Sequence, residues 1–358
     1  MQVSDYLIFD EESGTYIEDP EQVVRDDVEK HHWLNVLRVV LKDWRLYLML
    51  VPMILVFLFW RYFPMYELLG CFKMPDSIKS VAEQDYVGFS HFRTLIFGNA
   101  NSSISPEFWR AFRNTFLLSF YGLLFGFPTP IIVALFFNEI RSNIARSVLQ
   151  VATYLPKFMS TVVMTSLVVM LVKGGGQMSG YGILSQMFEA MGAIDHDTAV
   201  KGLLHMPEFF RAIYQISGIW EGAGYDSIVF FAAIIAISPT SYEAAQMDGA
   251  GKMAQMRYVV LPSILSTIVI MLITRIGSLL SIGYEKVILL YNTDTYQTGE
   301  VVSTFAIRYG VNGEGASGSR SPNKGLASAA EMMNNVVGML LVIGANTVAR
   351  KASDVSLY

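Results

Sequence analysis

The stretch from Asn114 to Asn138 contains no charged side chain in 25 consecutive residues. An α-helix rises about 1.5 Å per residue and the hydrocarbon core of a bilayer is about 30 Å thick, so a run of this length can cross a membrane. Pro128 and Pro130 predict a kink, which neighbouring helices tolerate in a membrane bundle. The stretch therefore predicts a transmembrane helix.

The composition of the whole chain favours the same class. Apolar residues make up 53% of the 358 residues and charged residues only 16%, whereas soluble domains average about 25% charged residues. No stretch alternates apolar and polar residues like the strands of a membrane β-barrel. The predicted fold class is an all-α membrane protein with six transmembrane helices, at residues 46–66, 112–138, 147–172, 212–238, 258–282 and 327–349.

Charge is distributed unevenly along the chain. Residues 1–30 carry ten acidic and two basic side chains, so the net charge of −5 arises from this start. The remaining chain has no basic stripe, which argues against nucleic acid as a partner. A single cysteine, Cys71, excludes an intrachain disulfide. We expect an acidic cytoplasmic N-terminal tail at residues 1–40 and a transmembrane permease domain in membrane lipid at residues 41–358.

The loops between the predicted spans indicate the orientation. Two short loops, at residues 139–146 and 239–257, lie on one face of the membrane with both termini, and three long loops lie on the other. The basic residues that flank the short-loop face are Arg38, Lys42, Arg45, Arg141, Arg146, Arg350 and Lys351. By the positive-inside rule, this face and both termini are cytoplasmic.

Familiar catalytic, nucleotide-binding and metal-binding motifs are missing. Gly251-Lys252 resembles the end of a phosphate-binding loop, but Gln246 stands where that loop needs a glycine and Met253 where it needs Ser or Thr. The sequence also lacks HExxH, GxSxG and CxxC. We therefore expect no enzymatic activity, no catalytic residue, no metal site and no cofactor in this chain.

The short loop at residues 239–257 is polar and contains glycine. Thr240 and Glu243 fit a capping box that starts a short helix. Gly249 breaks or bends this helix, and Pro262 marks the entry into the fifth span. The pattern predicts an elbow of two short helices on the membrane surface, through which a bound partner can push on two transmembrane helices.

The elbow carries a motif of fixed spacing: a glutamate and two alanines, a glycine four residues later, and a Leu-Pro pair after a further stretch. In this sequence the motif residues are Glu243, Ala244, Ala245, Gly249, Leu261 and Pro262. The motif resembles the EAA motif of ABC importer permeases, in which isoleucine is more usual at the position of Val259. Residues 282–292 and 346–351 resemble the LplB-like branch of the carbohydrate-uptake permeases, which are relatives of the maltose permease.

The resemblance covers nearly all of residues 40–358 and implies a type I ABC importer permease fold. It implies a second homologous permease, two ABC ATPase subunits that hold ATP and magnesium, and an extracellular solute-binding protein as partners. The elbow would be the coupling helix that sits in a groove on an ATPase. We expect a bacterial plasma-membrane importer that moves a carbohydrate, and an oligosaccharide in particular, by alternating access.

Polar side chains within the predicted spans are candidates for the substrate site, because intramembrane charges are costly and often functional. The substrate-lining candidates are Trp220, Glu221, Tyr225, Asp226, Asn334 and Asn335. The first four combine aromatic and polar groups as sugar sites do, although a wet segment near the outer surface would look the same. The two asparagines either line a cavity or hydrogen-bond to a neighbouring helix.

Lys157, Arg275 and Glu331, each within a predicted span, are further charged candidates. For Lys157 and Arg275 the sequence favours interfacial positions. Two other functions stay open: an ion-coupled secondary transporter, which would be expected to show inverted repeats that are not evident here, and a non-transporting membrane assembly protein. Copurification of a stoichiometric ATPase would distinguish an importer from both.

Overall fold

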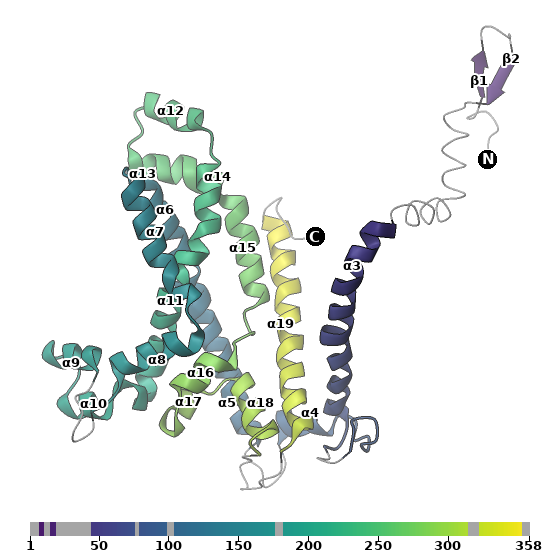
Figure 1. Cartoon of the computed structure of the whole chain (residues 1–358), viewed down its shortest axis with the longest axis vertical. Coiled ribbons are helices and arrows are strands. Elements are labelled where there is room, and N and C mark those ends of the chain that lie inside the picture. The colour runs from purple at the N-terminus through teal and green to yellow at the C-terminus, as the bar shows by residue number, and fades with distance from the viewer. Residues whose placement is uncertain are drawn as a thin grey trace. The chain divides into compact units, whose positions relative to one another are not determined.

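The computed structural model describes residues 7–10, 15–18, 44–75, 79–98, 104–175, 182–313 and 322–352. It forms two units, Met1–Leu68 and Leu69–Tyr358, whereas the sequence placed the boundary at residue 40. In the first unit, β1 (Leu7–Asp10) pairs antiparallel with β2 (Thr15–Glu18) (Figure 1). This hairpin lies in the segment that the sequence assigned to a tail.

A long apolar helix follows, which begins in the first unit and ends four residues into the second. α3 (Trp44–Phe57) continues into the π-helical η2 (Leu58–Tyr62) and then into η3 (Phe63–Phe72). No residue of α3 or η2 is buried within the protein. Such a surface suits lipid, because a helix satisfies its own backbone hydrogen bonds and needs no water around it.

The secondary-structure elements of the second unit are helices, and its described residues add only two isolated β-bridges. Its first elements are α4 (Ser90–Phe97), α5 (Ile104–Tyr121), η4 (Gly122–Gly126), α6 (Pro128–Glu139), α7 (Asn143–Phe158), α8 (Thr161–Val172), α9 (Ile183–Ala190), α10 (His196–Lys201), η5 (Leu203–His205) and α11 (Pro207–Ile235). The elements that follow are α12 (Pro239–Met247), α13 (Lys252–Gln255), η6 (Met256–Val260), α14 (Leu261–Ser263), α15 (Leu265–Gly277), α16 (Tyr284–Leu290), η7 (Thr293–Thr295), α17 (Tyr296–Gly299), α18 (Val302–Gly310) and α19 (Lys324–Ala352).

Within the described residues, four uninterrupted helical stretches are long and apolar enough to cross a membrane. These are Trp44–Phe72, Ile104–Glu139, Pro207–Ile235 and Lys324–Thr347. Two bent pairs, α7 with α8 at 100° and α13–α14 with α15 at 61°, cover the other two predicted spans, so the total is six when each pair is taken as one span. The all-α fold class is confirmed.

The sharp bend between α7 and α8 has a local cause. Met159 and Ser160 are extended, and the Ser160 hydroxyl accepts a hydrogen bond from the Val163 backbone at 3.4 Å, so it caps a new helix. In the stretch that opened the sequence argument, the π-helical η4 precedes Pro128, where α6 begins. Both prolines therefore lie in the first turn of α6, where a backbone N–H has no partner within the helix to lose.

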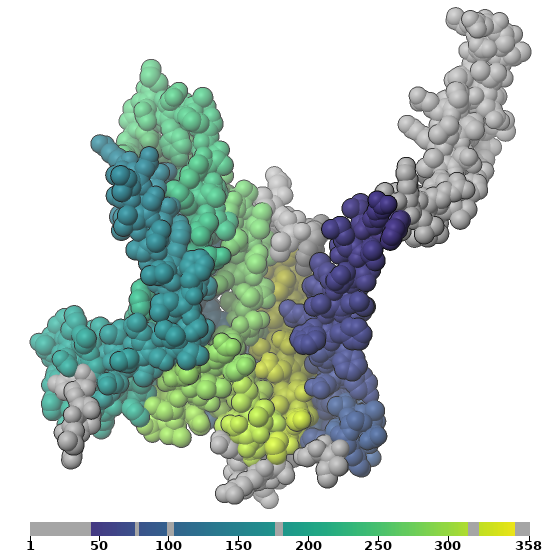
Figure 2. All heavy atoms as spheres, viewed as in Figure 1, coloured from purple at the N-terminus to yellow at the C-terminus, as the bar shows by residue number. Residues whose placement is uncertain are grey.

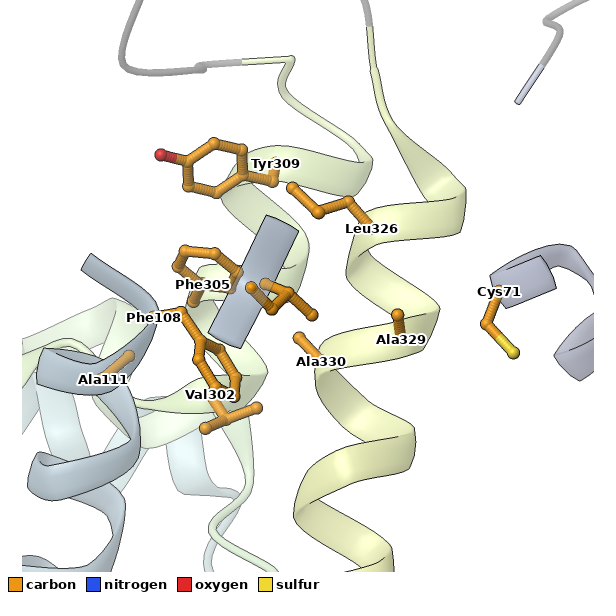
Figure 3. Close-up of a cluster of buried hydrophobic side chains, with 10 residues drawn as sticks. Cys71, Phe108, Ala111, Val302, Phe305, Tyr309, Leu326, Ala329 and Ala330 are labelled. Carbon is orange, nitrogen blue, oxygen red and sulfur yellow. The ribbon is translucent and has the colours of Figure 1, made fainter. Parts of the chain in front are cut away.

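Three hydrophobic clusters hold the second unit together. The cluster in Figure 3 joins α4, α5, α18 and α19, and its small members Ala111, Ala329 and Ala330 are fully buried. Small side chains let helices approach closely, which is how membrane helices gain packing contacts. A second cluster joins α5, α8, α11 and α16, and a third joins α6 and α11 to the segment that leaves the elbow.

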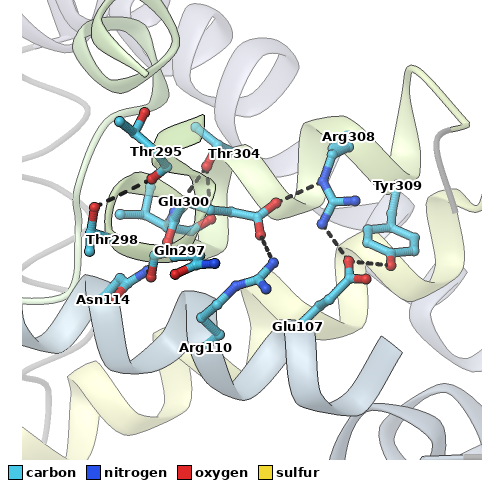
Figure 4. A network of polar contacts seen from close by, with 11 residues as sticks. Glu107, Arg110, Asn114, Thr295, Gln297, Thr298, Glu300, Thr304, Arg308 and Tyr309 are labelled. Carbon is cyan, nitrogen blue, oxygen red and sulfur yellow. Dashed lines mark hydrogen bonds and ion pairs between the residues drawn. The ribbon is translucent and has the colours of Figure 1, made fainter. Parts of the chain in front are cut away.

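A network of charged side chains ties α5 to α17 and α18 (Figure 4). Glu300 is fully buried, and its carboxylate accepts hydrogen bonds from Arg110 Nη2 at 3.0 Å and from Arg308 Nε at 2.7 Å. Arg308 Nη2 also donates to Glu107 at 2.6 Å, and the Tyr309 hydroxyl donates to the same carboxylate at 2.8 Å. Charge-assisted hydrogen bonds of this kind stabilise a buried ion only when its partners are complete.

Candidate functional site

A polar cavity of about 360 Å³ lies between the α5–η4 segment, α11, α15 and α16. Five charged side chains line it, three cationic and two carboxylate: Lys157, Arg275, Lys286, Glu221 and Asp226. Charges are expensive inside a membrane domain and commonly mark a substrate path. The cavity is therefore the candidate functional site.

The spacing of residues along α11 explains how one helix contributes both the space and the carboxylates. Glu221 and Gly222 follow Gly218 by three and four positions, so both lie on the helix face of Gly218, and Asp226 follows Gly222 by one turn. A Cβ atom at Gly218 would lie 3.5 Å from Lys286 Nζ, and one at Gly222 would lie 3.5 Å from Asp226 Oδ2. The glycines thus leave room beside the charged groups.

Lys286 is held in place by contacts on α11. Its Nζ lies 3.3 Å from Glu221 Oε2 and 5.5 Å from the centre of the Tyr214 ring. Burial lowers the pKa of the Lys286 ammonium from its ordinary value, and the Glu221 carboxylate opposes that shift. Both side chains are mostly buried, so this ion pair is shielded from water.

The other three charges have no such partners. Within the described part of the chain, Lys157, Arg275 and Asp226 make no hydrogen bond and no ion pair through their side chains. Two cations and one carboxylate therefore face the cavity with open bonding capacity. The same described residues contain no group of three or more His, Cys, Asp or Glu side chains placed to hold a metal ion.

The structure separates the aromatic candidates on α11 from the charged ones. Glu221 and Asp226 line the polar cavity, whereas Trp220 lines a neighbouring, mainly apolar pocket of about 260 Å³. Tyr225 packs edge-on against Phe158, with ring centres 5.9 Å apart. Successive residues of a helix point about 100° apart, so four close neighbours in the sequence cannot all face one cavity.

Lys157 and Arg275 lie in this cavity, whereas the sequence favoured interfacial positions for both. Lys286 was missed altogether, because it lies outside the predicted spans and its partner Glu221 is 65 residues away. The one signal for Lys286 in the sequence was its position close to the end of a predicted span. No local pattern links the two residues.

A second polar cavity, of about 270 Å³, contains the remaining candidates, Asn334 and Asn335, together with Glu331. Asn334 Nδ2 donates to the Leu280 carbonyl at 2.9 Å while the residue also lines this cavity. The two alternatives for Asn334, a cavity position and a contact with a neighbouring segment, therefore hold together.

The elbow forms a protruding end of the second unit (Figure 2). Its first helix, α12, is capped by Ser238, whose hydroxyl accepts from the Thr240 backbone at 3.4 Å. The predicted capping box at Thr240 and Glu243 is therefore wrong by two residues, because Pro239 already occupies the first turn. Gly249 adopts φ +75°, a conformation that favours glycine, and makes the predicted bend.

The exposed side of the elbow includes most of its motif. Glu243 and Ala244 are exposed, Ala245 is partly buried, and Met247 is 89% exposed. An apolar side chain so far out of the protein suits a surface that a partner covers.

The other end of the elbow is anchored to the membrane helices. Leu261 packs against the cluster that joins α6 and α11, next to the exposed Pro262. Lys252 forms an ion pair with Glu139 at the end of α6. A displacement of the elbow would therefore reach α6, α11 and α15 together.

Comparisons with known proteins place this geometry among transport proteins. The family model described as binding-protein-dependent transport system inner membrane component matches residues 126–285. Protein LplB of Bacillus subtilis (strain 168) is 31% identical over 326 residues, which cover 91% of this chain and 94% of that protein. The polygalacturonan/rhamnogalacturonan transport system permease protein YteP of the same organism is 32% identical over 313 residues, covering 87% of this chain and 90% of that protein.

Two solved structures of ABC transporters are also similar to this chain. The chain is similar to a chain in the crystal structure of a bacterial alginate ABC transporter in complex with alginate pentasaccharide-bound periplasmic protein, with a TM-score of 0.75 and 38% identity. The match covers 89% of this chain and 99% of that one. A second structure, of a bacterial ABC transporter involved in the import of the acidic polysaccharide alginate, matches with a TM-score of 0.74 and 38% identity over 88% of this chain and 99% of that one.

Proposed function

The chain belongs to the family of binding-protein-dependent transport system inner membrane components, and from this membership we propose that it carries acidic oligosaccharides across the membrane. It is a permease subunit of a carbohydrate ABC importer, and thus a transport subunit rather than an enzyme. The substrate class, the coupling mechanism and the orientation are our proposals.

The charge of the polar cavity carries the proposal on the substrate. Lys157, Arg275 and Lys286 outnumber the two carboxylates, and the first two have open bonding capacity. Arginine and lysine are the side chains that recognise carboxylates. The named relatives that import alginate or polygalacturonan support a sugar that carries carboxylate groups. Glu221 and Asp226 would then accept hydrogen bonds from its hydroxyl groups.

The elbow is proposed to couple this cavity to ATP hydrolysis. Glu243, Ala244, Ala245 and Gly249 would present the surface that docks on one of two partner ATPases, which hold ATP and magnesium. Leu261 with Pro262 would pass the movement into α15. A second homologous permease and an extracellular solute-binding protein complete the assembly. ATP drives alternating access only if its binding favours one permease conformation over the other.

The proposed orientation places the elbow and both chain termini in the cytoplasm. Basic residues near the elbow side of the spans, such as Arg141 and Arg146, support it. The long connections that contain α9, α10, α17 and α18 would then face the solute-binding protein. A cytoplasmic elbow is required if it meets ATPases.

The test uses the complete importer, with its binding protein, reconstituted in lipid vesicles. Uronate oligosaccharides should stimulate ATP hydrolysis and uptake more than neutral ones of equal length. Arg275→Gln should raise the concentration of acidic sugar for half-maximal uptake by about tenfold, since it removes one charged contact. Arg93→Gln, an exposed arginine on α4 outside the cavity and the elbow, is the charge-matched control.

Equal stimulation by neutral sugars, together with unchanged uptake in Arg275→Gln and Lys157→Gln, would contradict the acidic substrate. The absence of a stoichiometric ATPase from the purified complex would contradict the coupling role of the elbow. These two results are independent of each other.

A further inference from the structure

The second cavity has a lining unlike that of the first. Asn334 and Asn335 follow Glu331 by three and four positions on α19, so one helix face presents them to the same space. Ser281 and Ser303 line it from the other side. Among its described lining residues there is no lysine, arginine or histidine. A positively charged partner for the carboxylate is therefore missing from the wall.

Two lining groups have hydrogen-bonding capacity that the fold does not use. Asn334 is 4% exposed, and its Oδ1 is buried without a hydrogen-bond partner, although its Nδ2 is satisfied by the Leu280 carbonyl. Glu331 makes no hydrogen bond or ion pair within the described residues. Leaving a buried acceptor without a hydrogen bond costs about 1–3 kcal/mol, and an unpaired carboxylate inside a membrane domain costs more. These groups are placed for a ligand.

The two groups just described, the Glu331 carboxylate and Asn334 Oδ1, are both acceptors, so a ligand that satisfies them must bring donors. The Ser303 hydroxyl already donates to the Ile282 carbonyl at 2.9 Å and is not available for Glu331. Sugar hydroxyl groups are neutral donors, and two neighbouring hydroxyls can donate to the two oxygens of one carboxylate. The Asn335 amide adds both a donor and an acceptor. The lining therefore suits an uncharged polyhydroxylated part of a ligand.

The two cavities share a wall. Ser281, Ile282 and Gly283 line both of them. The two cavities are therefore adjacent, and a ligand long enough to extend past this segment would reach the second one from the first. An extended molecule that carries carboxylate in one part and hydroxyl groups in the next would satisfy both linings.

We propose that the second cavity is a separate subsite for the hydroxyl groups of an adjoining sugar unit, so that this chain alone contacts at least two units of an oligosaccharide. Glu331, Asn334 and Asn335 are its specificity-determining residues. This inference rests on the proposed transport function, and it makes the importer sensitive to the length of its substrate.

The test measures equilibrium binding of radiolabelled galacturonate and trigalacturonate to the detergent-solubilised importer complex. Glu331→Leu should weaken trigalacturonate binding about tenfold, as expected for the loss of hydrogen bonds to a charged group, and leave galacturonate binding unchanged. Glu331→Gln keeps one acceptor and the side-chain shape, so it should give a smaller loss. Glu285→Gln, an exposed residue outside both cavities, is the control.

Three outcomes would overturn the inference. They are equal losses for both sugars, no loss in either Glu331 variant, and a loss that depends on the sodium or potassium concentration, which would indicate a cation in place of sugar. If Arg275→Gln weakens binding while Glu331→Leu does not, only the second subsite is wrong. If the complex binds neither uronate, the acidic substrate is wrong, and glucose with maltotriose then decides the subsite by the same comparison.

Discussion

Gly218 and Gly222 lie one turn apart on α11 and face the cavity, where a Cβ atom would lie 3.5 Å from Lys286 Nζ and 3.5 Å from Asp226 Oδ2, respectively. Gly224 lies on another face of the same helix and has a different task. It packs against α7, where a Cβ would lie 2.6 Å from the Thr153 carbonyl carbon and 2.8 Å from its Cβ. One helix thus uses glycine both for an open cavity and for a tight helix contact.

At the residue scale, Gly224→Ala should destabilise the protein. The added methyl group overlaps backbone atoms of α7, and such overpacking costs about 1–3 kcal/mol. The thermal midpoint of the detergent-solubilised protein should fall by several degrees. Gly344→Ala, also in a transmembrane helix but with no atom within 4 Å of the new Cβ, should leave it nearly unchanged. Equal midpoints for both variants would show that α7 and α11 do not pack as described.

Among the elements, α5 and α18 are joined by a buried ion as well as by the hydrophobic cluster of Figure 3. Glu300 joins Arg110 of α5 to Arg308 of α18, and Asn114 of α5 donates to the Glu300 carbonyl at 3.1 Å. Arg211 of α11 in turn donates to Asn114 Oδ1 at 3.1 Å. The network therefore connects α5, α11 and α18, which contribute residues to the walls of the two cavities.

At the element scale, Glu300→Ala should cost about 3–5 kcal/mol, because it leaves two arginines without their buried partner. We expect a large fall in the thermal midpoint and a low yield of folded protein. Glu83→Ala, on an exposed turn, serves as the control. If the yield is too low to measure, Glu300→Gln, which keeps the size and one acceptor, gives a smaller but measurable shift. An unchanged midpoint in both Glu300 variants would mean that the network adds no stability.

At the scale of the whole molecule, the same two helices, α11 and α15, connect the elbow to the cavity. α11 runs into the elbow and carries Glu221 and Asp226, and α15 runs out of it and carries Arg275. Any movement of the elbow is therefore transmitted to groups that line the substrate cavity. This continuity is the physical basis of the proposed coupling.

At this scale, Gly249→Val should reduce ATP-driven uptake by at least tenfold while sugar binding to the complex persists. Valine is strained at φ +75°, so the elbow changes shape without a change in the cavity. Gly192→Val is a matched control, because Gly192 also has positive φ and open space around it but lies far along the chain from the elbow. Equal losses of uptake in both variants would point to general strain rather than coupling.

The parts of the fold that could be predicted are those that depend on neighbouring residues. The length of an apolar run determines whether a helix can cross a bilayer, and the spans, the elbow and the EAA-like motif follow from such local patterns. Even there, the tertiary structure bent two spans and moved the helix cap from Thr240 to Ser238. The count of uninterrupted spans therefore came out below six.

The sequence by itself determined the membrane class, the positions of the helices and the elbow, because hydropathy and motif spacing act along the chain. Only the tertiary structure decided which polar groups meet. It brought Lys286 to Glu221 across 65 residues, separated Trp220 from its neighbour in the sequence, and placed Glu331 in a cavity of its own. The physical reason is that such meetings depend on the rotation and packing of whole helices, which no local pattern specifies.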